Sequence, residues 1–112
     1  MAWFRRRRGG RSAAEVRDEE REAAQHLVEW MAGRHGIEIF TEPRTSVTSP
    51  TMMLVAHDGE FTRRPVRSPE DAEKFARDHA LPIYDATVVG YPQRMRDYSR
   101  RQTLQKRRDA RG

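Results

Sequence analysis

Residues 51–66 decide the fold, and their sequence is TMMLVAHDGEFTRRPV. Two apolar-rich runs flank Asp58-Gly59, a dipeptide that favours a two-residue type I′ turn between antiparallel strands. That turn predicts a hairpin in which Ala56 pairs with Phe61, so that Phe61 shares the core face of the sheet with Met52, Leu54 and Ala56. Pro65 cannot donate a hydrogen bond to a neighbouring strand. We therefore expect the second strand to end at Pro65 or to lie at an edge of the sheet.

A capped helix is expected directly after the hairpin. Ser68 is a typical N-cap residue, and Pro69 fits the first helical position. Glu70 and Asp71 then lie in the first turn, where the helix dipole favours negative charge. This pattern predicts a helix that runs to about His79.

The hairpin and this helix together, residues 51–79, loosely resemble the small sheet-and-helix modules at the N-termini of phage-type integrases. The resemblance implies nucleic acid as a ligand. Pro65, and the strand and helix expected after residue 79, depart from that pattern.

The segments on either side complete an α+β domain. Ser12 and Glu15 fit a capping box, which begins a helix that Gly36 would stop. Alternating and apolar runs predict two more strands, and the absence of Gly and Pro after residue 92 permits a last helix. The expected order is α-β-β-β-α-β-α with a mostly antiparallel sheet: helices over about 13–34, 69–79 and 93–108, and strands over 37–41, 51–57, 60–66 and 83–89.

Charge is sorted along the chain. Residues 1–11 carry five arginines and no acid, residues 12–91 have a net charge of −6, and residues 92–112 have a net charge of +6. We therefore divide the chain into a flexible basic arm (1–11), an acidic α+β body (12–91) and a basic C-terminal helix or tail (92–112). Basic ends of this kind attract polyanions.

Several function classes find no support in the sequence. There is no cysteine, which excludes disulfides and thiolate chemistry. His26, His35, His57 and His79 have no i, i+4 spacing typical of a metal site, and no serine lies in a nucleophile elbow. No apolar run is long enough to span a membrane. We expect a cytoplasmic protein that is not an enzyme and has no metal and no cofactor.

The leading prediction is a small non-enzymatic protein that binds nucleic acid or a ribonucleoprotein through phosphate contacts. A C-terminal helix would align Arg94, Arg101 and Arg108 on one face, with Arg100 and Arg107 beside them, and Tyr98 could stack on unpaired bases. The opposing interpretation is that Met95 and Tyr98 dock this helix while its arginines are only solvated. The predicted contact residues are Arg5, Arg6, Arg7, Arg8, Arg94, Tyr98, Arg100, Arg101, Arg107 and Arg108.

The alternative from another class is a protein-interaction or regulatory adaptor. Its partner would be an acidic protein or an anionic membrane surface, which Trp3 and Phe4 beside the first arginines could enter. The basic ends could also fold back onto the acidic turns of residues 15–22. The sequence leaves the choice between DNA and RNA open, and also the oligomeric state.

Overall fold

The computed structural model describes residues 12–112 and confirms the α+β class. The contacts divide the chain into two compact units, with the boundary between Gly33 and Arg34. In the first unit the structure describes helix α2 (Ala13–Ala32). The predicted cap is present, since the Ser12 hydroxyl accepts a hydrogen bond from the Glu15 N–H at 3.1 Å. The expected arm, with Arg5 to Arg8, lies outside the described residues.

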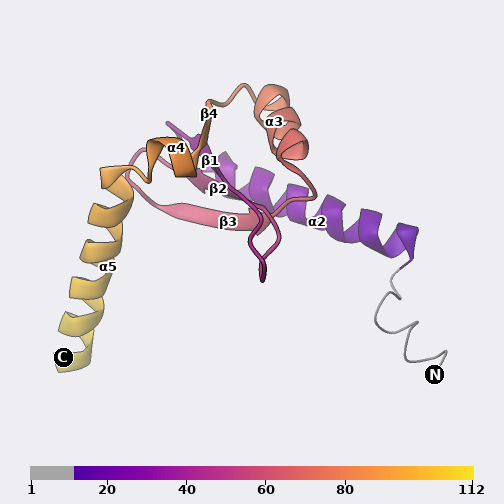
Figure 1. Ribbon diagram of the computed structural model, residues 1–112. Coiled ribbons are helices and arrows are strands. Elements are labelled where there is room, and N and C mark those ends of the chain that lie inside the picture. The colour runs from indigo at the N-terminus through magenta and orange to yellow at the C-terminus, as the bar shows by residue number, and fades with distance from the viewer. Residues whose placement is uncertain (1–11) are drawn as a thin grey trace. The chain divides into compact units, whose positions relative to one another are not determined.

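The second unit contains a four-stranded sheet in the order β3-β2-β1-β4 (Figure 1). β1 pairs antiparallel with β2, and β2 pairs antiparallel with β3, whereas β1 and β4 are parallel. The expectation of a mostly antiparallel sheet is confirmed, as is the edge strand that ends at Pro65. The strands are β1 (Glu38–Glu42), β2 (Thr51–Val55), β3 (Phe61–Pro65) and β4 (Ile83–Asp85).

The hairpin forms where expected, but the predicted register is wrong by one residue. Phe61 pairs with Val55, and the Ala56 N–H donates to the Glu60 carbonyl at 2.8 Å. A type I′ turn requires positive φ at both central residues, and Asp58 does not adopt it, while Gly59 does at φ 92°. The loop therefore has three residues, and the Asp58 carboxylate accepts the Glu60 N–H at 3.0 Å.

The corrected register places Phe61 on a different face of the sheet from the one expected. Phe61 packs, half-buried, against a buried cluster rather than beside Leu54. β2 supplies the centre of the core, because all five residues from Met52 to Ala56 are buried. From Met52 to Val55 this strand is buried on both faces and carries only apolar side chains. The cluster that Phe61 joins consists of Phe40, Met53, Val55 and Ala86.

The segment after the sheet contains the second departure from the prediction. α3 (Pro69–Asp78) begins at Ser68 as expected, but the predicted strand over 83–89 ends at Asp85. The Asp85 carboxylate accepts hydrogen bonds from the Thr87 N–H at 2.8 Å and hydroxyl at 2.6 Å. This N-cap begins the short helix α4 (Ala86–Val89), because a capped turn outweighs the β-propensity of Val88 and Val89.

Candidate nucleic-acid interface

The predicted C-terminal helix is present as α5 (Gln93–Arg111). No Gly or Pro interrupts it, and two i, i+4 amide–carboxylate contacts support its exposed surface. Gln93 donates to Asp97 at 2.9 Å, and Gln105 donates to Asp109 at 3.0 Å. The helix follows Pro92 and leads away from the sheet to which its first turns are attached (Figure 1).

The first turn of α5 is anchored by Arg94. Its Nε donates to the Ala56 carbonyl at 3.0 Å, and its Nη2 pairs with the Glu38 carboxylate at 2.5 Å. Both side chains are about 29% exposed, and Met95 beside them packs on the Phe40 cluster. Arg94 therefore contacts the sheet and the hairpin, so at this end of the helix the face that Arg94 shares with Arg101 is turned toward the fold.

Close backbone contact with the hairpin turn fixes the next turn of the helix. A Cβ at Gly59 would lie 1.9 Å from the Arg94 carbonyl oxygen and 2.9 Å from the Tyr98 Cβ. Tyr98 is half-buried beside this turn, and the Arg101 guanidinium lies 5.8 Å from its ring centroid. Arg101 also donates to the Asp58 carbonyl at 2.9 Å. The predicted stacking residue is thus part of the docking contact.

Beyond Tyr98 the helix has a different environment, because every residue from Ser99 to Gly112 is exposed. This distal half, Ser99–Arg111, carries six basic residues against one acid, Asp109. The nearest acid before it, Asp97, lies 3.7 Å from Arg100 in an exposed i, i+3 pair, which is worth little in water. The six basic residues are Arg100, Arg101, Lys106, Arg107, Arg108 and Arg111.

The arginines of the distal half form two rows. Residues seven apart lie almost in line on an α-helix, so Arg100 is followed by Arg107 and Arg101 by Arg108. The two rows lie about 100° apart around the helix axis. Four of the predicted contact residues are therefore brought together on one exposed surface, while Arg94 and Tyr98 lie at its base.

A polar cluster around Glu42 was not predicted from the sequence. Glu42 accepts hydrogen bonds from Thr51 Oγ1 at 2.7 Å, from Arg63 Nε at 2.5 Å and from the Tyr91 hydroxyl. Burial opposes ionisation of Glu42, but these hydrogen bonds outweigh it, and its pKa is lowered. The hydrogen bond to Glu42 in turn raises the pKa of Tyr91. The alternation of side chains along a strand could have indicated this cluster, because it places Glu42 on the same face of the sheet as Phe40.

Another ion pair lies near the hairpin turn. Arg34 donates to both carboxylate oxygens of Glu60, at 2.7 and 2.8 Å, and this contact lowers the pKa of Glu60. Beside it, the rings of His35 and His57 are stacked with centroids 3.8 Å apart. These contacts tie the start of the second unit to its hairpin.

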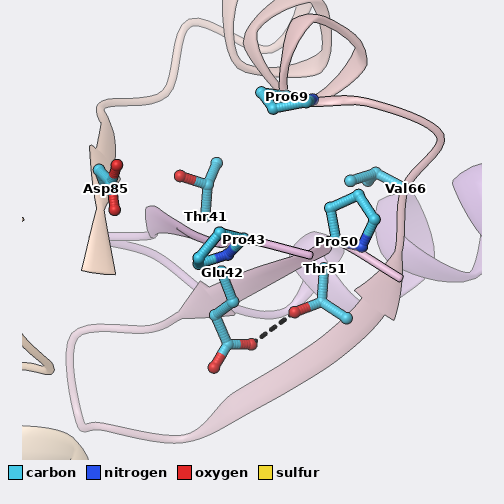
Figure 2. Close-up of a pocket in the computed structure, with 8 residues that line it drawn as sticks. All are labelled: Thr41, Glu42, Pro43, Pro50, Thr51, Val66, Pro69 and Asp85. Atoms are coloured by element: carbon cyan, nitrogen blue, oxygen red, sulfur yellow. Dashed lines mark hydrogen bonds between the residues drawn. The ribbon is translucent and has the colours of Figure 1, made fainter. Parts of the chain in front are cut away.

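A shallow hollow lies at one end of the sheet (Figure 2). Its two carboxylates are already engaged, because Glu42 accepts from Thr51 and Asp85 caps α4. Within residues 12–112, no group of three His, Cys, Asp or Glu side chains is placed to hold a metal ion. The lining residues are Thr41, Glu42, Pro43, Pro50, Thr51, Val66, Pro69 and Asp85.

Comparison with known proteins gives no relative for this chain: no family model, no curated protein and no solved structure matches it significantly. Among the helices described over residues 12–112, none combines the length and the apolar character that crossing a membrane requires.

Proposed function

We propose that this protein is a cytoplasmic, non-enzymatic nucleic-acid or ribonucleoprotein-binding protein. In this proposal the distal half of α5 makes the main phosphate contacts, and Arg5 to Arg8 add further ones. The observation that carries it is the exposure of every residue from Ser99 to Arg111 together with their six basic side chains. A polyanion would neutralise these charges and release its own counterions, which favours binding.

The composition of the distal half favours nucleic acid over a membrane surface. A helix that lies in a membrane interface needs a broad apolar face, and Leu104 and Ala110 are the apolar residues of this half. Phosphate contacts need no such face. Arg94 and Tyr98 act indirectly in this proposal, because they fix the base of the helix to the sheet.

The proposal is tested first on the wild-type protein. We expect the purified protein to carry nucleic acid, which raises the ratio of absorbance at 260 nm to that at 280 nm. Treatment with a nuclease should remove the nucleic acid and lower this ratio. After nuclease treatment, its affinity for oligonucleotides should fall steeply and linearly on a plot of log affinity against log salt. Absence of binding near about 50 mM salt would refute the proposal, because phosphate contacts are strongest at low salt.

A further inference from the structure

Leu104 is an exposed large apolar residue at the centre of the basic surface. The residue is 44% exposed and lies on the helix half in which every residue is exposed. On an α-helix the surface neighbours of a residue are those three and four positions away. For Leu104 all four of these neighbours are arginines: Arg100, Arg101, Arg107 and Arg108.

This arrangement places a narrow apolar line between two cationic rows. Arg100 and Arg107 lie about 40–60° to one side of Leu104 around the helix axis, and Arg101 and Arg108 lie about 40–60° to the other. A complementary surface would therefore have two anionic ridges with a less polar floor between them. The major groove of duplex DNA has this form, since phosphates wall it and base edges, including thymine methyl groups, make its floor.

We propose, on the basis of the function proposed above, that the distal half of α5 enters the major groove of duplex DNA. Leu104 faces the base edges, while the Arg100–Arg107 row and the Arg101–Arg108 row each face one phosphate strand. The groove is about 12 Å wide and an α-helix with its side chains is about 10–12 Å across, so the helix fits.

The attachment of α5 to the sheet is compatible with insertion of its distal half into the major groove. Arg94 and the Gly59 turn hold its first turns against the sheet, so that the exposed half projects as a single unit (Figure 1). From Ser99 to Arg111 the helix is roughly 20 Å long. Because side chains are exposed on all sides of this half, both walls of a groove can be reached at once.

The same dimensions argue against double-stranded RNA. An A-form duplex has a deep and narrow major groove that side chains cannot enter, and its wide minor groove is shallow. A helix with cationic rows on both sides of a central leucine would there meet phosphates with one row only. We therefore expect duplex DNA to bind more tightly than a duplex RNA of the same sequence.

The groove is tested with duplexes that have the same phosphates. The full chain is titrated by fluorescence anisotropy with a duplex DNA, with the matching duplex RNA, and with the same DNA in which glucosylated 5-hydroxymethylcytosine fills the major groove. We expect the RNA and the filled DNA to bind about tenfold or more weakly than plain DNA, as expected for the loss of a direct contact. Equal affinities for all three would overturn the groove assignment and leave phosphate binding intact.

The face is tested with two variants that change the charge equally. Leu104→Glu places a carboxylate between the arginine rows, whereas Gln102→Glu places one about 160° away around the same exposed helix. We expect Leu104→Glu to lower the affinity for duplex DNA about tenfold or more, and Gln102→Glu by less than about threefold. Circular dichroism should show unchanged helix content in both. Equal losses would overturn the inference, and no binding by the wild type to any oligonucleotide would overturn the proposed function as well.

Discussion

Gln93–Tyr98 of α5 packs against the sheet and the hairpin turn, whereas Ser99–Arg111 of the same helix is exposed throughout. The difference is clear in two arginines of the same helix. Arg94 is 29% exposed and is paired with Glu38, while Arg100 is 68% exposed. Position on the fold, and not residue type, thus divides one helix into a structural half and a half available to a ligand.

The division of α5 into a structural half and an exposed half predicts the largest loss of stability at the contact between Gly59 and Arg94. Gly59→Ala adds a Cβ 1.9 Å from the Arg94 carbonyl oxygen at a residue with φ 92°. We expect the free energy of unfolding to fall by about 2–5 kcal/mol, from the positive φ and the overpacking together. The measurement is urea denaturation followed by circular dichroism.

Gly90→Ala provides the matched control for that substitution. Gly90 also has a positive φ of 74°, but no atom lies within 4 Å of its added Cβ. Only the backbone cost should remain, which is about 1–3 kcal/mol because φ 74° and ψ 179° lie in a region that only glycine adopts readily. If both variants lose the same stability, the close approach of the turn to α5 does not contribute.

The next effect separates the two kinds of arginine. Arg94→Gln leaves the half-buried Glu38 without its charged partner, and we expect a loss of about 1–3 kcal/mol. Arg100→Gln removes an exposed side chain and should change stability by less than about 0.5 kcal/mol. The effects on nucleic-acid binding should be the opposite. Arg100→Gln should flatten the slope of log affinity against log salt, and Arg94→Gln should leave it unchanged. Comparable destabilisation by both variants would contradict the division.

Low pH should weaken the polar cluster around Glu42, which holds Tyr91 just before α5 begins. The pKa of Glu42 is lowered in the folded protein, so its contribution to stability is complete above its ordinary pKa of about 4.3 and is lost as pH falls through the folded value. At pH values below about 4.3 we expect the urea concentration at the midpoint of unfolding to decrease. In Glu42→Gln this decrease should be less steep. An identical pH profile for that variant would mean that the carboxylate is not stabilised by its hydrogen bonds.

A small effect on stability is also expected when the exposed half is removed altogether. A chain that ends at Tyr98 keeps Arg94 and Met95, which make the contacts with the sheet. We expect its thermal midpoint to change by no more than about 2–4 °C, which corresponds to about 0.5 kcal/mol for a domain of this size. Loss of a cooperative transition would show that residues 99–112 belong to the folded core.

Local signals were sufficient to predict most of the fold. The helix start at Ser68-Pro69 and the hairpin around Asp58-Gly59 depend on neighbouring residues, and both are present. The register was missed because Asp-Gly also fits a three-residue loop with only the glycine at positive φ. The end of β4 was missed because Asp85 competes as a helix cap with the strand propensity that follows it.

The candidate site was less predictable, because helical spacing shows which residues share a face but not which face meets the sheet. Arg94, Arg101 and Arg108 are in line by spacing, yet the partner of Arg94 is Glu38, 56 positions earlier in the chain. Such a contact depends on tertiary packing. The Arg100–Arg107 row makes no such contact with the sheet, and its helical spacing alone predicts the shared face.

The most direct test of the exposed half as the binding element is the salt dependence of the quadruple variant Arg100→Gln, Arg101→Gln, Arg107→Gln and Arg108→Gln. On duplex DNA each lost phosphate contact flattens the slope of log affinity against log salt by about 0.9, so we expect about 3–4 units less slope than in the wild type. Arg44→Gln with Arg77→Gln, two exposed arginines outside α5, should leave the slope unchanged. A quadruple variant with the full wild-type slope would contradict the assignment of binding to this half of the helix.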